Sequence, residues 1–337
     1  MVTYFITGIS GFLGKNVALQ LLEKDVKIVG FVLPSDKEIS FYKNYPNVTL
    51  VEGDILKKDD VKKFLSTPHE GKKIVIHSAG YISTYKRHDK RCMDINVNGT
   101  KNVVDVCLEN KDVDKLVYVS SVDAIKRVEG NEDIFEPIKY NEKETIGIYS
   151  KSKTIASKYV MESCEKGLDA SIALPSVILG PSDPLSAPIN VAIKKYLNNK
   201  LPAVVKGGYD MVDVRDVANG IILISEKGKK GESYLLTGTH VSVTGFINIA
   251  AKIENRKPFN KTIPLFLIYI VSPFIELFAR LRKRRPLFTS FAMGCLTQNS
   301  NYNHQKATQE LGYSHRDLEI TVRDTIEWMK STDYLSR

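Results

Sequence analysis

Residues 2–14 read VTYFITGISGFLG, and this stretch decides the fold. An apolar run ends in glycines at positions 8, 11 and 14, and apolar residues at helical spacing follow. The pattern predicts a strand, a tight turn and a helix whose free N-terminal N–H groups and dipole favour a pyrophosphate. Gly8 allows the turn, Gly11 lets the backbone approach the phosphates, and Gly14 lets the helix pack close to the strand. The spacing is G-x-x-G-x-x-G, so a dinucleotide-binding turn is favoured over an ordinary glycine-rich turn because of its strand-to-helix context.

Strand-like apolar segments alternate with helical segments through the first half of the chain. Such alternation predicts a parallel sheet covered by helices on both faces, which is the doubly wound α/β (Rossmann) fold. We expect a dinucleotide-binding domain over residues 1–175 and a smaller, mainly helical substrate-binding portion over residues 176–337, interleaved with the last strands. The expected strands are residues 2–7, 26–33, 48–55, 73–80, 115–121 and 169–175.

The composition is that of an ordinary globular protein: 337 residues, 43% hydrophobic and 26% charged. Its four cysteines are scattered without a C-x-x-C pair, which indicates thiols in a reducing compartment and no metal site. The net charge of +9 comes mostly from dispersed lysines, so solvated faces are favoured over nucleic-acid binding. Because the first strand begins at once, we expect no secretory signal and a cytoplasmic protein.

One apolar segment, residues 263–279, precedes a basic cluster at residues 280–285. The segment is short for a membrane span and contains Pro273 and Glu276. The favoured interpretation is a pair of helices that wall a substrate pocket. The alternatives are a surface element that contacts a membrane through residues 263–285 and a true span.

Tyr149 and Lys153 form a Y-x-x-x-K pair at the start of the helix that follows the fifth strand. Residues four apart share one face of a helix, so the ammonium can approach the phenol. A nearby positive charge favours phenolate and lowers the phenol pKa from about 10 toward neutrality. Such a tyrosine can exchange a proton with a carbonyl or hydroxyl oxygen. The alternative is an exposed helical pair without chemistry.

Several motifs together resemble the extended short-chain dehydrogenase/reductase family, within the NAD-dependent epimerase/dehydratase superfamily. The resemblance covers nearly the whole chain and is strongest to dihydroflavonol-4-reductase and 3β-hydroxysteroid dehydrogenase types. The motifs are TGISGFLG (7–14), GDI (53–55), HSAG (77–80), NVNGTKNVV (96–104), YVSSVDAI (118–125), LPSVILGP (174–181) and DVRDVANGIILI (213–224).

The resemblance implies a catalytic set. A reduced nicotinamide delivers hydride to a carbonyl carbon while Tyr149 protonates the oxygen. Ser121 hydrogen-bonds that oxygen, Lys153 binds the nicotinamide ribose, and Asn96 holds a proton-relay water. The plainer alternatives are that Ser121 ends a strand and that Asn96 satisfies buried backbone groups.

The resemblance also implies the cofactor contacts. Asp54 would accept from the adenine amino group, although it could instead be a helix N-cap, and Ser120 could simply end a strand. The full set is Gly8, Ser10, Gly11, Phe12, Leu13, Gly14, Leu33, Lys37, Asp54, Ile55, Ala79, Gly80, Ser120, Tyr149, Lys153, Pro175 and Val177.

The choice between NAD and NADP depends on the end of the second strand. An acid there binds the ribose 2′-hydroxyl and an arginine accommodates a 2′-phosphate, but the position is Leu33. Ser35 and Lys37 could meet a phosphate, whereas Asp36 could repel it. The missing acid favours NADP slightly.

The favoured function is an NAD(P)-dependent oxidoreductase that interconverts a ketone or aldehyde and an alcohol. The apolar 263–279 segment suits a fairly apolar small-molecule substrate. One alternative is a nucleotide-sugar epimerase or dehydratase with tightly bound NAD, in which Arg215 or residues 280–285 would hold the diphosphate. Another is a non-catalytic dinucleotide sensor, which the retention of Ser121, Tyr149 and Lys153 disfavours. The resemblance also implies a homodimer.

Overall fold

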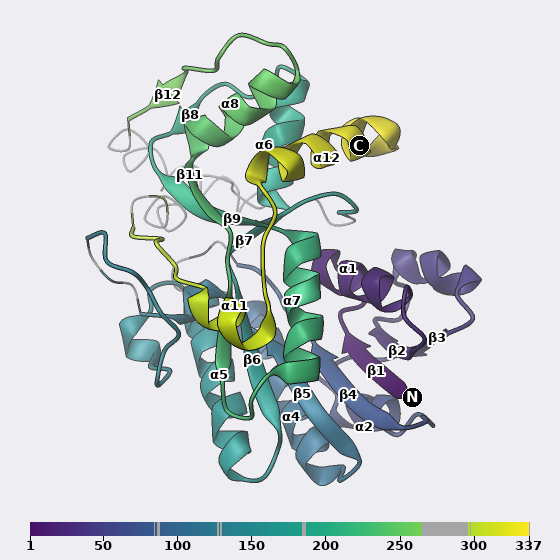
Figure 1. The fold of residues 1–337 in the computed structure, drawn as a ribbon. Coiled ribbons are helices and arrows are strands. Elements are labelled where there is room, and N and C mark those ends of the chain that lie inside the picture. Colours follow the sequence, from purple (N-terminus) through teal and green to yellow (C-terminus); the bar gives the residue numbers. More distant parts are fainter. Residues whose placement is uncertain are drawn as a thin grey trace.

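The computed structural model describes residues 1–83, 85, 88–126, 128, 130–183, 187–264, 296 and 298–336. In that part of the chain, seven strands form the main sheet in the order β10-β6-β5-β4-β1-β2-β3 (Figure 1). All neighbouring strands are parallel, so the predicted doubly wound α/β fold is confirmed. The strands are β1 (Val2–Thr7), β2 (Lys27–Val32), β3 (Val48–Glu52), β4 (Lys72–His77), β5 (Val113–Val119), β6 (Ala170–Pro175) and β10 (Ser233–Leu236).

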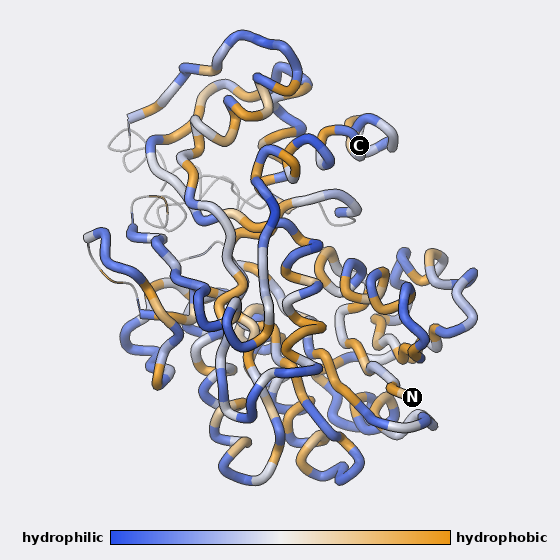
Figure 2. Tube along the Cα trace, viewed as in Figure 1, coloured by the Kyte–Doolittle hydropathy of each residue, from blue (hydrophilic) through white to orange (hydrophobic). Residues whose placement is uncertain are grey.

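Helices cover both faces of this sheet. One face packs on α1 (Phe12–Leu21), α7 (Val214–Lys227) and α11 (Gln305–Leu311). The other packs on α2 (Lys58–Leu65), α4 (Thr100–Glu109) and α5 (Ile148–Glu165). Figure 2 shows apolar residues gathered along the strands between these layers. Because both faces are covered, the inner strands are buried almost without alternation, whereas the edge strand β3 is only partly buried.

The chain beyond β6 also builds a smaller lobe. Within the described residues it holds a three-stranded sheet of β7 (Val177–Leu179), β9 (Gly208–Asp213) and β11 (Thr239–Ser242), and a pair of β8 (Val204–Val205) with β12 (Thr262–Ile263). A separate apolar core joins α6 (Pro188–Leu197), α8 (Val243–Ile253) and α12 (Leu318–Ser331). Since α7 and β10 return to the main sheet, the two parts interleave.

The described residues also form short helices: η1 (Lys37–Asn44), α3 (Lys90–Met93), the π-helix η2 (Asp94–Gly99), η3 (Val122–Ala124), η4 (Glu142–Glu144) and η5 (Asp333–Leu335). Apart from Ile263 and Pro264, the apolar segment 263–279 and the cluster 280–285 lie outside the described residues. In the portion that is described, no helix combines the length and the apolar character needed to cross a bilayer.

Candidate active site

The glycine turn has the backbone that the sequence predicts. Gly8 has φ +72°, and a Cβ there would lie 2.8 Å from the Ala79 Cα. A Cβ on Gly14 would lie 2.1 Å from the Gly8 carbonyl oxygen. Gly11 donates its N–H to Gly8 at 2.9 Å and is the N-cap of α1, where no side chain caps the helix. The turn is thus a backbone cradle at a helix N-terminus, which fits a pyrophosphate.

An acid lies beside this cradle, at a position that the sequence analysis did not favour. The Asp36 N–H donates to the Leu33 carbonyl at 3.1 Å, and Ser35 has φ +66°. This turn carries Asp36 back toward the glycines, where its carboxylate accepts a hydrogen bond from Ser10 Oγ at 2.6 Å. The side chain of Leu33, by contrast, is 54% exposed. In the sequence, the signal for this contact is an acid, Asp36, directly after the turn-forming pair Pro34–Ser35.

A second acid lies in the same segment. Lys15 Nζ forms an ion pair with Glu38 at 2.9 Å and lies 3.9 Å from the Phe41 ring centroid. The charge of Lys15 is therefore balanced by Glu38. Lys37 is exposed at the first position of η1.

Asp54 lies in the loop after β3, at the sheet edge where the cradle also lies. Its Oδ1 accepts from the Leu56 N–H at 2.9 Å, and its own N–H donates to Asp60 at 3.0 Å. The N-cap of α2 is Lys57, so the helix-cap alternative for Asp54 is wrong. Its neighbour Ile55 is buried against Gly99.

Ser121 and Tyr149 meet where β5 ends and α5 begins. Ser121 is the N-cap of η3 and accepts the Asp123 N–H at 3.1 Å. Burial raises the pKa of Tyr149 above its ordinary value, the Asp123 charge adds to this, and a hydrogen bond with Ser121 opposes it. The expected lowering of this pKa by Lys153 is therefore wrong for the protein alone, because burial dominates.

Lys153 is shielded from water at the carboxyl end of strand β5. Its side chain is buried, and Nζ donates to the Val119 carbonyl at 2.8 Å. Burial lowers its pKa to about 8. A Cβ on Gly80 would lie 3.3 Å from this Nζ and 3.4 Å from Asn96 Oδ1. Glycine at position 80 thus leaves room for both side chains.

The side chain of Asn96 holds the backbone of Tyr81. Its Oδ1 accepts the Tyr81 N–H at 2.8 Å, and its Nδ2 donates to the Tyr81 carbonyl and to Ser152 Oγ, both at 2.9 Å. It is buried within the π-helix η2. These contacts match the plainer alternative, in which Asn96 satisfies buried backbone groups.

The remaining expected residues lie along the same edge. Ser120 Oγ shares a hydrogen bond of 2.7 Å with Ser157 Oγ, which joins the end of β5 to α5. Pro175 ends β6 beside Leu236, and Val177 begins β7. Phe12 and Leu13 form the first turn of α1. The structure thus gathers the predicted residues after β1, β3, β4, β5 and β6.

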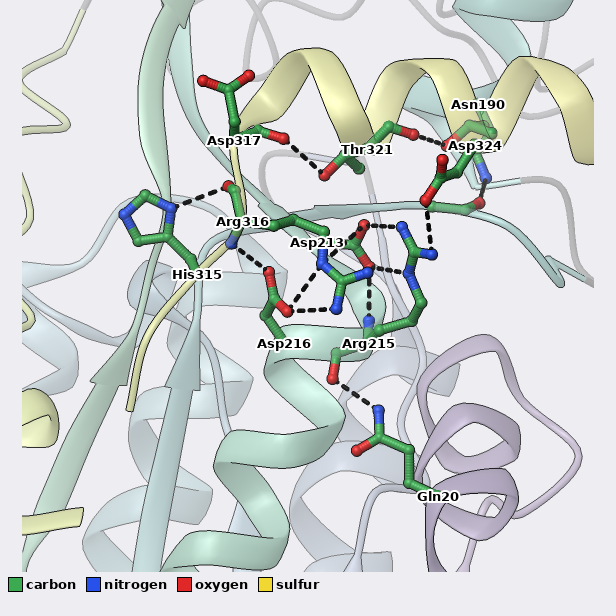
Figure 3. Close-up of polar contacts among 12 residues, drawn as sticks. Gln20, Asn190, Asp213, Arg215, Asp216, His315, Arg316, Asp317, Thr321 and Asp324 are labelled. Atoms are coloured by element: carbon green, nitrogen blue, oxygen red, sulfur yellow. Dashed lines mark hydrogen bonds and ion pairs between the residues drawn. The ribbon is translucent and has the colours of Figure 1, made fainter. Parts of the chain in front are cut away.

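Arg215 lies elsewhere and is held by two carboxylates (Figure 3). Its Nε and Nη2 donate to Asp213 at 2.9 and 2.6 Å, and its Nη1 pairs with Asp324 at 2.7 Å. The interpretation that Arg215 holds a diphosphate is not supported, because its guanidinium is already engaged.

Comparison with known proteins agrees with this geometry. The model of the 3-beta hydroxysteroid dehydrogenase/isomerase family matches residues 5–237. The chain belongs to this family. Its membership confirms the predicted relationship to the extended short-chain dehydrogenases/reductases and identifies an NAD(P)-dependent oxidoreductase.

Individual relatives align over nearly their whole length. A protein of Synechocystis sp. named as a candidate dihydroflavonol 4-reductase is 27% identical over 98% of this chain and 96% of its own. A sterol-4-alpha-carboxylate 3-dehydrogenase of Schizosaccharomyces pombe is 25% identical over 95% of each chain. The crystal structure of gox2253 is 30% identical, covers 98% of each chain and superposes with a TM-score of 0.82.

Proposed function

We propose that the chain is an NAD-dependent oxidoreductase that interconverts a ketone or aldehyde and an alcohol on a fairly apolar small molecule. The observation that carries this proposal is the hydrogen bond between Ser121 and Tyr149, with Lys153 bound to the Val119 carbonyl beside Ser120 and Ser121, at the same end of the sheet as the glycine cradle. The names of the sterol and dihydroflavonol relatives favour a ring-bearing, apolar substrate. No contact of the described residues favours the sugar-nucleotide alternative, since Arg215 is engaged.

The residues of the site fit a nicotinamide dinucleotide. The backbone from Gly8 to Gly14 would hold the pyrophosphate, because a side chain at Gly14 would close the turn. Asp54 would accept from the adenine, and Lys153 would hold the nicotinamide ribose. When bound, this cofactor supplies or accepts the hydride at the substrate carbon.

The protein supplies the proton. A raised pKa keeps the Tyr149 phenol protonated at neutral pH, so it can donate to the substrate oxygen during reduction. Ser121 hydrogen-bonds the same oxygen and stabilises its developing negative charge. In the oxidation direction Tyr149 must accept the proton from the substrate hydroxyl.

Asp36 favours NAD over NADP. A 2′-phosphate near the cradle would approach a carboxylate that Ser10 fixes at 2.6 Å, and like charges in contact are costly. A ribose 2′-hydroxyl could instead donate to that carboxylate. This geometry reverses the slight preference for NADP that the missing acid at Leu33 gave.

The preference is tested by the dissociation constants of NADH and NADPH for the wild type and for Asp36→Asn. We expect NADH to bind more tightly to the wild type, and the Asn variant to lose about tenfold of that discrimination. Lys43→Gln is the matched control, because Lys43 is exposed in the same helix η1 and is not one of the expected cofactor contacts. Tighter binding of NADPH to the wild type would contradict the assignment.

The reaction is tested with a panel of cyclic ketones, a dihydroflavonol, a 3-ketosteroid and UDP-sugars, with the cofactor followed at 340 nm. We expect oxidation of NADH with a carbonyl substrate and none with UDP-sugars. Conversion of a UDP-sugar without net change of cofactor would instead establish the epimerase alternative.

A further inference from the structure

Three lysines are buried in the described part of the chain, and they differ in what balances their charge. Lys73 and Lys115 are 1% and 7% exposed, and each pairs with a carboxylate, Asp112 at 2.9 Å and Asp169 at 2.8 Å. Lys153 is 5% exposed, and among the described residues no carboxylate forms an ion pair with it. A buried ammonium without such a partner needs another source of stabilisation.

The aromatic ring of Tyr118 lies next to the Lys153 ammonium. Tyr118 is in β5, next to the Val119 carbonyl that accepts from Lys153, and it is fully buried. Its ring centroid is 5.0 Å from Lys153 Nζ. A cation within about 6 Å of a ring centroid is attracted to the ring face, most strongly where water is excluded.

We propose that Tyr118 is a positioning residue whose ring keeps the buried Lys153 ammonium charged and in place. The consequence for cofactor and phenol rests on the function proposed above, but the contact itself does not. A carboxylate at this position would stabilise the ammonium and cancel its charge. A neutral ring stabilises the ammonium and leaves its positive field to act on the ribose oxygens and on Tyr149.

The ring of Tyr118 is itself held by a buried histidine. The rings of His77 and Tyr118 stack with centroids 5.5 Å apart and planes 28° apart. Thr7 fixes Nδ1 of His77 at 2.7 Å, and Thr100 fixes Nε2 at 2.9 Å. Burial and the charge of Lys153 lower the pKa of His77 to about 3, so the stack is neutral at working pH.

The other titratable groups near Lys153 do not neutralise its positive charge. The Cys92 thiol, on α3, has a pKa raised by burial and is therefore neutral near pH 7. Tyr149, on the same helix as Lys153, is a neutral phenol in the protein alone. Asp123 of η3 acts on Tyr149. Cys92 still acts to raise the Lys153 pKa, and the Val119 carbonyl and the Tyr118 ring are the neutral groups that contact the Lys153 ammonium and offset its desolvation.

The test measures the pKa of Lys153 directly in the full-length protein, by titrating the 13Cε resonance of labelled lysines. The Lys153 signal is identified by its loss in Lys153→Arg. We expect Tyr118→Leu to lower this pKa by about one pH unit, whereas Tyr118→Phe keeps the ring and the wild-type value. Phe5→Leu is the matched control, because the ring centroid of Phe5 lies 5.0 Å from the buried Lys73 ammonium, which has a carboxylate partner, and Phe5 is also fully buried.

Fluorinated phenylalanines at position 118 guard against a folding defect of Tyr118→Leu, because they keep the ring shape while weakening the ring's attraction for a cation. We expect the Lys153 pKa to fall as fluorines are added. An unchanged pKa along this series, or an equal shift in Tyr118→Phe and Tyr118→Leu, would overturn the inference.

A second readout is the pH at which NADH affinity is lost, followed by NADH fluorescence. We expect this midpoint to fall together with the Lys153 pKa. A lowered pKa with unchanged NADH binding would keep the contact but refute the proposed role of Lys153 in cofactor binding.

Discussion

Single glycines set the distance between the first strand and the first helix. The built Cβ at Gly14 overlaps the Gly8 carbonyl at 2.1 Å, and backbone cannot move aside as a flexible side chain can. At Gly11 the same carbonyl is 3.2 Å away. The two glycines therefore differ in what a methyl group would cost, although they lie in the same turn.

Replacing these glycines with alanine tests that difference. We expect Gly14→Ala to lower the free energy of unfolding by about 1–3 kcal/mol and to abolish NADH binding, because α1 must move away from β1. Gly11→Ala should cost less than about 1 kcal/mol of stability, since a small shift relieves its contact. Urea unfolding measures both variants, and equal losses would contradict the packing described here.

For single residues, the sequence predicts those features that depend only on residues nearby in the chain. The glycine spacing and the Tyr149–Lys153 pair were readable because each acts within one turn. The contact of Asp36 with Ser10 is not readable in this way, because a turn at Leu33–Asp36 returns the acid to Ser10, which is distant in sequence. The raised pKa of Tyr149 was also missed, since it reflects burial and Asp123.

At the scale of elements, His77 joins three of them through its ring nitrogens. It ends β4 and contacts Thr7 of β1 and Thr100 of α4. Its pKa is lowered to about 3 in the folded protein, whereas an unfolded histidine titrates near 6.5. Between these pH values the unfolded state binds the extra proton, so acid favours unfolding.

The pH dependence of stability tests this connection. The contribution of His77 is fully present above about pH 6.5 and is lost as the pH falls toward 3, by up to about 1.4 kcal/mol per unit. Urea unfolding of the wild type and of His77→Gln at pH 7.5, 6.5 and 5.5 should give a steeper decline for the wild type. Identical slopes would mean that His77 is not held neutral.

The helices and strands are predictable from the sequence where consecutive residues are buried. The inner strands of the main sheet are mainly apolar because helices cover both faces. The π-helix η2 and the contacts of Asn96 were not predictable, because they depend on Tyr81 from another segment. The side chain of Asn96 supports the loop after β4, and the water-holding role that the resemblance implies for Asn96 stays a prediction.

At the scale of the whole molecule, an ion-pair network joins the sheet to the smaller lobe (Figure 3). Arg215 at the start of α7 bridges Asp213 and Asp324 of α12. Arg316, which precedes α12, donates to Asp216 at 2.7 Å. Gln20 of α1 donates to the Arg215 carbonyl at 2.7 Å, so the cofactor-binding helix is part of the same connection.

The two carboxylates of Arg215 differ in burial, and this predicts unequal effects. Asp213 is fully buried and Asp324 is 31% exposed. We expect Arg215→Met to destabilise by about 3 kcal/mol, because the buried Asp213 loses its main partner. Asp324→Asn should cost less than about 1 kcal/mol. Urea unfolding distinguishes them, and a larger loss for Asp324→Asn would be inconsistent with this network.

The overall topology was predictable from alternating segments, but this network was not. The pairs that join the two parts, Arg215 with Asp324 and Arg316 with Asp216, lie about a hundred residues apart, and sequence charge gives no partner at such separation. Sequence charge alone leaves Arg215 available for a diphosphate, whereas in the structure its guanidinium is engaged by Asp213 and Asp324.

The most direct test of the proposed chemistry compares the wild type with Tyr149→Phe, with NADH binding and turnover of a carbonyl substrate recorded on the same preparations. We expect the variant to bind NADH within about threefold of the wild type and to lose turnover by at least about a thousandfold. A variant that retains turnover would contradict the assignment of Tyr149 as proton donor and, with it, the proposed chemistry.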